Sequence, residues 1–402
     1  MHRGLGALIL LPCLAACGGT AEQKPDTGTI TVWDYYGSST PIKPVIAAFE
    51  RAHPGIKVDY QAYDYETMRQ KYATSVAGGT APDVATLDMT WIPTYAAKHT
   101  LSELPDTLNG KPIDSQYAKG ALDAMRFDDH YVTAMYDFDA YALYYRKDLV
   151  KTPPRTWAEL TQTAATLKKG KFQVLPDTFH FAQFLFQAGG DLVGDGKAAF
   201  AGPQGVKALT QLHDLLKRGG LYWGDDQGDS SGIAGIKDGR IAMFLNGPYM
   251  MGVLKEGAPD QRGKWAVAPA PIDTRPGSYL GGTGLSIPAT SEHKGAAWDF
   301  IQFLLQPPQQ VKVFTVAGAA PATEVALKDP ALAAPDPYFG GQVTFPVFQN
   351  ALASARHYPY VKQWTEIDKA VTDGVTAALL DKKSPQQALT DAAKEVDDLL
   401  VD

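Results

Sequence analysis

Strand-like and helix-like patterns alternate near the start of the chain, and this alternation limits the possible folds most strongly. In two short segments apolar residues occupy every second position, the period of a half-buried strand, and a third short segment is also predicted to be a strand. Between them apolar residues recur at helical spacing, and Pro54-Gly55 and Gly78-Gly79 end the two helical segments. A strand–helix–strand–helix–strand order implies parallel strands joined by right-handed crossovers. In chain order the segments are 29–33, 41–53, 56–60, 65–76 and 83–87.

A second region of strands and helices follows in the middle of the chain. Thr156 and Glu159 have capping-box spacing and begin one helix, and Pro203 begins another. Strands are predicted at 141–145, 241–245 and 265–270, and late helices at 296–305, 309–316, 364–380 and after Ser384. A length of 402 residues allows two or three domains. The predicted fold is α/β, with two lobes and late helices packed on them.

The first residues have the pattern of a secretory signal. Arg3 provides a positive charge before an apolar run that is too short to span a bilayer. The stretch Leu14-Ala15-Ala16-Cys17-Gly18 resembles the lipobox of bacterial lipoproteins, in which the cysteine starts the mature chain and carries the lipid. We therefore expect a signal peptide at 1–16, lipidation of Cys17 and a flexible tether at 17–27. The alternative is an ordinary signal peptide with a chance cysteine.

Cysteine content and charge exclude several functions. Cys13 would be removed with the signal, which leaves one cysteine and therefore neither an intramolecular disulfide nor a cysteine nucleophile. A formal charge of −7 without a basic cluster argues against nucleic acid. The eight histidines form no H-x-H or H-E-x-x-H pair, so we expect neither a metal nor a cofactor. We expect the mature protein to be a monomer that its lipid holds at the extracytoplasmic face of the cell membrane.

Several loops near predicted strand ends are rich in aromatic, acidic and hydroxyl side chains. Ligands of parallel α/β sheets bind beyond the carboxyl ends of the strands. Sugar hydroxyls donate and accept together, so one carboxylate can accept from two of them, and an aromatic face packs against sugar C–H groups. The combination favours a sugar ligand. The loops are 34–39, 88–91, 136–139, 246–249, 281–284 and 356–360, with Trp364 beyond.

Some of these residues also fit structural roles. Asp34 could cap a turn, the glycine run 281–284 could be a bend, and Trp223 could line the site or cover it. Residues 228–232 match the letters G-x-S-x-G, but no apolar strand precedes them to form a nucleophile elbow. Neighbouring carboxylates such as Asp128-Asp129 seldom face each other across a glycosidic bond. A binding protein is therefore favoured over a secreted glycosidase.

A series of motifs, in order, resembles the extracellular solute-binding proteins of ABC importers, in the carbohydrate-binding branch related to maltose-binding protein. The motifs are Thr31-Val32-Trp33, His53-Pro54-Gly55, Gly78-Gly79-Thr80-Ala81-Pro82-Asp83, Tyr144-Tyr145-Arg146-Lys147-Asp148-Leu149 and Asn246-Gly247-Pro248-Tyr249. The resemblance implies a two-lobe periplasmic-binding-protein-like fold of type II with a hinge. Lobe 1 would hold 28–137 plus 286–335, and lobe 2 would hold 138–285 plus 336–402. A di- or oligosaccharide would be captured between the lobes and delivered to the transmembrane permease subunits.

The resemblance also implies roles for individual residues. Sugar-stacking positions fall on Tyr249 and Trp364, a hydroxyl-binding carboxylate on Asp139, and backbone donors on Gly282 and Thr283. Asp88 and Trp91 lie in a loop that contributes polar and aromatic contacts. The remaining candidate ligand-binding residues, from the loops described above, are Tyr36, Ser38, Asp137, Trp223, Arg356 and Tyr358.

Two departures from the family pattern limit the choice of ligand. Tyr249 stands where the family often has tryptophan, and Gly37-Ser38 stand where maltose-binding protein has a charged pair, so maltose is not the expected ligand. Arg356 and His357 could instead hold an anion, which keeps a receptor for a polar solute such as glycerol phosphate as the alternative.

Overall fold

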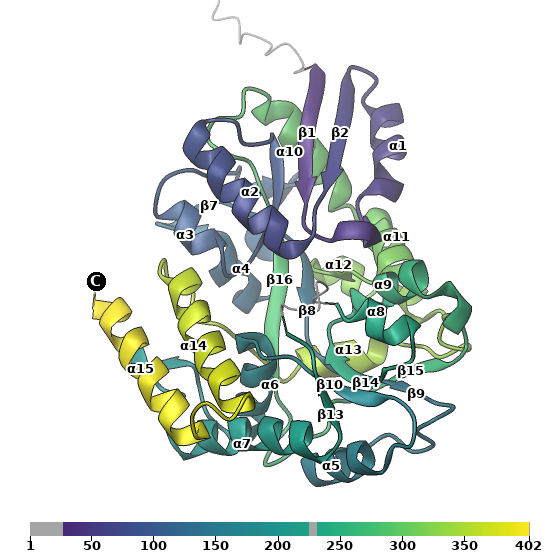
Figure 1. The fold of residues 1–402 in the computed structure, drawn as a ribbon. Helices are drawn as coiled ribbons and strands as arrows, with labels where there is room; N and C mark the ends of the chain where they lie inside the picture. The colour runs from purple at the N-terminus through teal and green to yellow at the C-terminus, as the bar shows by residue number, and fades with distance from the viewer. Residues whose placement is uncertain (1–26, 225–230, 402) are drawn as a thin grey trace, which may run out of the picture.

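Two mixed β-sheets form the framework of the molecule, one in the upper and one in the lower half of Figure 1. The computed structural model describes residues 27–224 and 231–401, and within these ranges the sheets have seven and five strands. The first has the order β17 (Ala320–Pro321), β8 (Ala134–Asp139), β16 (Ser278–Ser286), β3 (Val84–Asp88), β1 (Gly28–Asp34) and β2 (Ile56–Ala62), with β18 (Ala355–His357) also beside β16. The second has the order β13 (Gly220–Tyr222), β10 (Lys171–Val174), β14 (Ile241–Asn246), β9 (Ala142–Arg146) and β15 (Trp265–Ala268).

The predicted strand–helix alternation at the start of the chain is confirmed. β1 pairs in parallel with both β2 and β3, and the connections are α1 (Lys43–Ala52) and α2 (Tyr65–Gly78). The side chains of Ile30 and Val32 are completely buried. α1 begins later than predicted, because Thr40 has a left-handed backbone with φ of 36° and the next two residues form a turn.

β8 and β16 extend from the first sheet toward the second half of the molecule (Figure 1). The upper part of β16 pairs antiparallel with β3 and β8, while its first residues, Ser278 to Leu280, pair in parallel with β18. The bend considered for 281–284 is wrong, because these residues lie inside β16. A Cβ at Gly282 would lie 2.6 Å from the carbonyl oxygen of Asp137, so glycine is needed for this close approach of two strands.

Helices enclose the second sheet, and the predicted helix starts there are largely confirmed. Thr156 precedes α5 (Trp157–Thr166), and its Oγ1 accepts from the backbone N of Glu159 at 3.2 Å. The Glu159 carboxylate accepts from the backbone N of Arg155 at 2.7 Å, one residue before the position that a capping box predicts. The other helices of this half are α6 (Thr178–Ala188), α7 (Pro203–Arg218), α14 (Trp364–Leu379) and α15 (Pro385–Val401).

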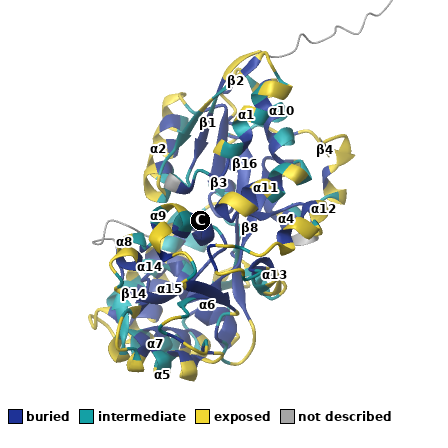
Figure 2. Cartoon of the chain, turned by 90° about the vertical axis from the view of Figure 1, so that its right-hand side faces the viewer, coloured by how far each residue is buried: buried dark blue, intermediate teal, exposed yellow. Residues whose placement is uncertain are grey.

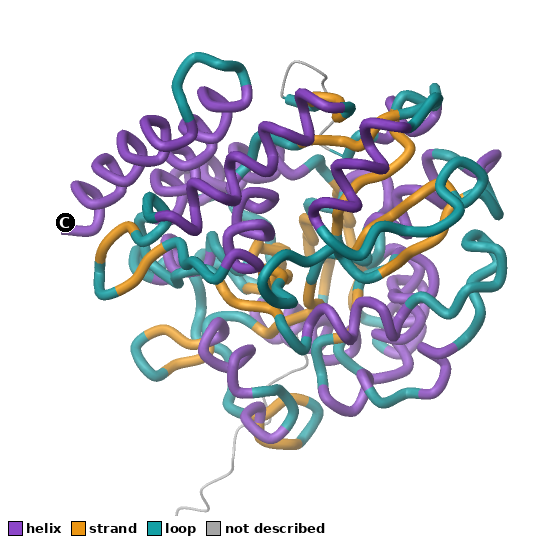
Figure 3. The backbone as a smooth tube through the Cα atoms, turned by 90° about the horizontal axis from the view of Figure 1, so that it is seen from below, coloured by secondary structure: helices purple, strands orange, loops and turns teal. Residues whose placement is uncertain are grey.

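The remaining helices and three hairpins complete the fold around this framework. The remaining helices are α3 (Ile92–Ala96), α4 (Lys119–Met125), α8 (Ile233–Lys237), α9 (Met250–Gly257), α10 (Lys294–Leu304), α11 (Pro307–Ala317), α12 (Glu324–Leu327) and α13 (Phe345–Leu352). Three small hairpins are β4 (Thr107–Leu108) with β5 (Lys111–Pro112), β6 (Arg126–Phe127) with β7 (His130–Tyr131), and β11 (Val193–Gly194) with β12 (Lys197–Ala198). Seen from below, helices surround the strands (Figure 3).

Each half of the molecule has its own buried interior (Figure 2). One core is built from buried residues between 30 and 138 and between 285 and 322. Two further cores surround the second sheet and include the buried residues of α14 and α15. Leu332, which the predicted lobe boundaries assign to lobe 1, packs in a core of the second sheet. The lobe boundaries as a whole stay a prediction.

The predicted signal peptide, Cys17 and most of the predicted tether lie outside the described residues. Across the described ranges 27–224 and 231–401, no helix combines the length and the apolar character needed to cross a membrane.

Candidate ligand-binding site

Asp137 on β8 is the centre of a hydrogen-bonded cluster, which we call the Asp137 hub: Asp137, Tyr35, Tyr36 and Thr283. Asp137 is completely buried, and it accepts hydrogen bonds from the Tyr36 hydroxyl and, at 2.9 Å, from the backbone N of Thr283. Thr283 Oγ1 lies 2.6 Å from the Tyr35 hydroxyl and 2.9 Å from the Tyr36 hydroxyl. Burial raises the pKa of Asp137 to about 7, although these hydrogen bonds oppose the shift.

Asp34, at the end of β1, supports the hub from behind. Its carboxylate accepts from the Tyr60 hydroxyl at 2.5 Å and from the backbone N of Tyr36 at 3.1 Å. The second bond closes a turn over two residues, so the turn-capping interpretation of Asp34 is confirmed. The turn directs Tyr36 toward Asp137, while the rings of Tyr35 and Tyr36 stack with centroids 4.9 Å apart. Burial raises the pKa of Asp34 to about 6.

Asp139 differs from Asp137 in having no hydrogen-bond partner in the part of the chain that the structure describes. It lies two residues farther along β8, on the same face of the strand, and is 9% exposed. Its carboxylate makes no hydrogen bond or ion pair with any described residue. Asp139 also lies close to the connection that follows β14, since a Cβ built at Gly247 would be 2.7 Å from Asp139 Oδ1. Burial raises the pKa of Asp139, and the charges of Asp137 and Asp88 raise it further.

Asp88 and Trp91 follow β3 at the same edge of the first sheet. Asp88 Oδ1 accepts from the backbone N and the Oγ1 of Thr90, at 2.9 and 2.5 Å. Burial raises the pKa of Asp88. Trp91 is 4% exposed, and its ring lies 4.7 Å from the Tyr65 ring and 5.6 Å from the Tyr35 ring. The structure therefore brings both residues into the aromatic surroundings of the hub.

Tyr249 approaches the hub from the second half of the molecule. It directly precedes α9, and its ring meets the Tyr36 ring edge-on with centroids 6.1 Å apart. The Tyr144 hydroxyl donates to the carbonyl oxygen of Gly247 at 2.7 Å and thereby fixes this connection. Tyr36, Asp139 and Tyr249 thus converge from both halves of the molecule.

Tyr358 and Trp364 belong to a second aromatic group, on the side of α14. Their ring centroids lie 4.7 Å apart, and Tyr279 packs 5.4 Å from Tyr358. Trp364 is 1% exposed and Tyr358 is completely buried. The Tyr358 hydroxyl has no hydrogen-bond partner among the described residues. In this arrangement the predicted stacking face of Trp364 is covered by Tyr358.

Asp368 is a candidate site residue that the sequence analysis missed. It lies one helical turn after Trp364 on α14, and its Oδ1 is buried without a partner among the described residues. Burial raises its pKa to about 7, and the charges of Asp177 and Asp88 raise it further. Its spacing of four residues from Trp364 was the available signal, because a helix places both side chains on one face.

Four predicted site residues do not join this group through a described side-chain contact. Trp223 is 1% exposed in the core of the second half, with the Arg240 guanidinium 5.1 Å from its ring. Arg356 pairs with Asp191 at 2.7 Å and donates to the Gly190 carbonyl oxygen at 3.2 Å. Ser38 lies in the 3-10 turn Gly37–Ser39, but its side chain is outside what the structure describes. Gly282 contributes backbone, since its carbonyl oxygen accepts from the backbone N of Met89 at 2.9 Å.

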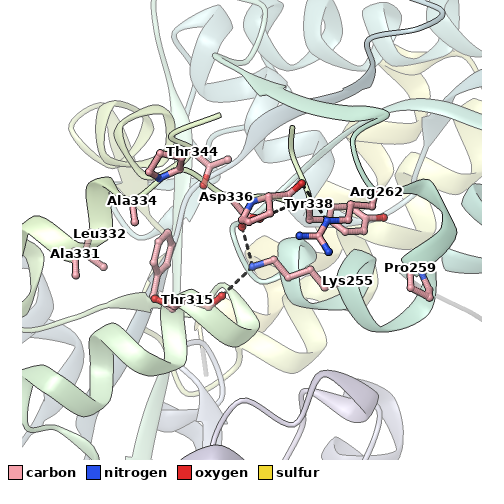
Figure 4. Close-up of a pocket in the computed structure, with 13 residues that line it drawn as sticks. Lys255, Pro259, Arg262, Thr315, Ala331, Leu332, Ala334, Asp336, Tyr338 and Thr344 are labelled. Carbon is pink, nitrogen blue, oxygen red and sulfur yellow. Dashed lines mark hydrogen bonds and ion pairs between the residues drawn. The ribbon is translucent and has the colours of Figure 1, made fainter. Parts of the chain in front are cut away.

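A separate cavity of about 320 Å³ lies between α9, α11 and the loop that precedes α13 (Figure 4). Lys255 projects into it, pairs with Asp336 at 2.8 Å and donates to the Thr315 carbonyl oxygen at 2.9 Å. None of the predicted site residues lines it. Within the described ranges, no group of three histidine, cysteine, aspartate or glutamate side chains could hold a metal ion.

Two α/β halves, joined by strands and presenting aromatic and acidic residues to each other, define a two-lobe periplasmic-binding-protein-like fold of type II. The chain belongs to the bacterial extracellular solute-binding proteins, whose family profile matches residues 45–338. The predicted fold class and family are both confirmed.

Relatives of known name and structure cover nearly the whole chain. A lactose-binding protein of Rhizobium radiobacter is 26% identical over 86% of this chain and 86% of its own length. An ABC transporter solute-binding protein of Thermotoga lettingae, solved with α-D-tagatose, is 26% identical with a TM-score of 0.81, over 93% of this chain and 100% of that one. The GacH receptor of Streptomyces glaucescens, solved unliganded and with acarbose, shares the fold at 23% identity with a TM-score of 0.83, over 94% and 99% of the two chains.

Proposed function

We propose that this protein captures a sugar, of di- or oligosaccharide size, between its two lobes and delivers it to the permease of an ABC importer. The observation that carries the proposal is Asp139, a buried carboxylate that has no partner among the described residues and lies close to Gly247, two residues before Tyr249. A buried acceptor without a donor costs free energy, so the site favours a ligand that supplies hydroxyl donors.

The neighbours of Asp139 fit the rest of a sugar. Tyr36 and Tyr249 provide aromatic faces, and Asp88 provides a second carboxylate near the site. The polar groups of the Asp137 hub hydrogen-bond to one another, unlike Asp139 and the unpaired atoms near α14. This part of the site is therefore rigid before the ligand binds. A rigid site loses less entropy on binding.

The relatives support the same class of ligand. The lactose-binding protein of Rhizobium radiobacter and the tagatose-bound protein of Thermotoga lettingae are each 26% identical to this chain. These names support a sugar without identifying which one this chain binds.

The proposal includes a location and a partner. The signal at 1–16, lipidation at Cys17 and a tether at 17–27 would hold the protein at the extracytoplasmic face of the cell membrane. A tether raises the local concentration of a monomeric receptor beside its permease. The lobes would close on the sugar, so the closed, loaded form is the one the permease engages. No catalytic step belongs to this function.

Intrinsic fluorescence tests the proposal directly. The protein is titrated with monosaccharides, disaccharides and glycerol phosphate, and each mixture is assayed for hydrolysis products. We expect saturable binding of at least one sugar and no product. Binding of glycerol phosphate alone, or release of a product, would overturn it. Asp139→Ala should abolish the response, while Asp381→Asn, at an exposed position with φ of 57° that asparagine tolerates, should keep it.

A further inference from the structure

We propose that the sugar is cationic, an amino sugar whose ammonium group is bound by Asp139 together with the neighbouring buried carboxylates. This inference rests on the proposed function and narrows its substrate class. It concerns Asp139, Asp88, Asp137 and Asp368, which we call the acidic set.

Thr283 of β16 stands opposite Asp88 of β3 on one side and opposite Asp137 of β8 on the other, so three members of the acidic set lie at one place in the first sheet. Asp137 and Asp139 share one face of β8. The charges of Asp137 and Asp88 oppose ionisation of Asp139, and the charge of Asp88 opposes ionisation of Asp368. β3, β8 and α14 thus bring carboxyl groups toward one region from both halves of the molecule.

No described cation neutralises this region. None of the four carboxylates forms an ion pair with a described lysine, arginine or histidine. The nearby Arg69 is paired with Glu66 at 2.6 Å. His180, which is 5% exposed, is paired with Asp177 at 2.8 Å and its Nε2 lies 3.0 Å from the Leu245 carbonyl oxygen. Both candidate counter-ions are therefore already engaged.

Unpartnered buried atoms mark the place where the ligand charge belongs. Asp139 is 9% exposed and makes no hydrogen bond with a described residue, and Asp368 Oδ1 is buried without a partner in the same part of the chain. A neutral hydroxyl can pair with these carboxyl groups but does not favour their ionised form, which burial disfavours. An ammonium group supplies three donors and the opposite charge together, and such charge-assisted hydrogen bonds are roughly twice as strong as neutral ones.

Matched sugars that differ only in one substituent test the inference. The probes are glucose, glucosamine and N-acetylglucosamine; galactose and galactosamine; and cellobiose with the corresponding disaccharide of glucosamine. Affinities are measured by calorimetry at a pH where the amines are protonated. We expect at least one amino sugar to bind about tenfold or more tightly than its neutral parent, and the N-acetyl form to lose this advantage.

Charge-removing variants show where the preference arises. Asp139→Asn keeps the size of the side chain and an acceptor oxygen, so the ratio of amino-sugar to neutral-sugar affinity should fall about tenfold. Asp368→Asn should lower the same ratio, which provides a second variant should Asp139→Asn fold poorly. Asp381→Asn removes a carboxylate that pairs with Lys217 and His213 on the surface, and it should leave the ratio unchanged.

The outcomes separate this inference from the proposed function. If neutral sugars bind as tightly as every amino sugar, or if Asp139→Asn and Asp368→Asn weaken both kinds equally, the cationic ligand is excluded and sugar capture stands. If no sugar of either kind binds, both proposals fail.

Discussion

Asp137 and Asp139 lie two residues apart on the same face of one strand, yet their surroundings are opposite. Asp137 accepts from the Tyr36 hydroxyl and from the backbone N of Thr283, and it is completely buried. Asp139 is 9% exposed and has no partner among the described residues. The difference teaches that one strand face carries two functions. The inner carboxylate holds the hub together, and the outer one is the group that we propose for ligand binding.

The same contrast separates the Asp137 hub from the surroundings of α14. The lobe around the first sheet supplies a network in which tyrosine, threonine and aspartate satisfy one another. Near α14, by contrast, buried polar atoms of Tyr358 and Asp368 have no partner among the described residues. Satisfied networks favour a fixed geometry, whereas unsatisfied buried atoms favour a ligand that pairs with them.

The largest expected effect is on stability when the two aspartates are each replaced by alanine. Asp137→Ala leaves the Tyr36 hydroxyl and the Thr283 backbone N unpaired in a buried place, which should cost about 2–5 kcal/mol of unfolding free energy. Asp139→Ala removes a charge that no described residue stabilises, so it should be neutral or slightly stabilising. Urea unfolding of both variants measures the difference, and equal losses would remove the distinction between the two residues.

A smaller effect concerns pH. Burial raises the folded-state pKa of Asp368 from 3.8 to about 7, so the folded protein holds a proton that the unfolded chain releases. The wild-type protein therefore loses stability as pH rises through this window, by at most roughly 1.4 kcal/mol per pH unit from this group.

Asp368→Asn cannot lose that proton. The stability of this variant relative to wild type should grow from about pH 4 to pH 7 and then level off. Other titrating groups, including Asp34 and Asp137, are common to both proteins and cancel in the difference. Chemical unfolding at a series of pH values gives the curve, and a flat difference would show that Asp368 is not held protonated by its burial.

The smallest expected effect is that of Tyr36→Phe. The ring stays in contact with Tyr35 and Tyr249, but its hydrogen bonds to Asp137 and to Thr283 Oγ1 are lost. Their loss should cost about 1–3 kcal/mol, because Asp137 keeps the bond from the Thr283 backbone N and Thr283 Oγ1 keeps its contact with the Tyr35 hydroxyl. Thermal unfolding measures this cost. The matched control is Tyr63→Phe. The Tyr63 hydroxyl donates to half-buried Gln61 at 2.6 Å and lies away from the hub, so its removal should cost less.

Local patterns were sufficient to predict much of the fold. Apolar alternation at 29–33 and 56–60 predicted the parallel pairing of β1 with β2, because strand and helix periods are properties of neighbouring residues. The long strand β16 was missed, since its glycines have no alternating pattern and are required by contacts with β8. Strand pairing between distant segments depends on packing that no local pattern reports.

The candidate site shows the same limit. Loop composition after β1 and β3 was enough to single out Tyr36 and Asp88, because strand ends in parallel sheets meet at one edge. Asp368 was missed, since a carboxylate among Glu366 and Lys369 resembles a solvent-exposed helix position. Arg356 was singled out as an anion holder, but the structure pairs it with Asp191. Whether a charged residue is available depends on its neighbours in space.

The path of β16 has a mechanical consequence. One continuous strand is paired with β3 and β8 at its end and with β18 at its beginning, so the halves share a ribbon instead of a loose joint. Such a strand ribbon bends more easily perpendicular to its plane than within its plane. Gly281, Gly282 and Gly284 have no side chains that would hinder bending in this part of the strand. We therefore expect the two halves to rotate about one axis, so that each closure brings the same two surfaces together.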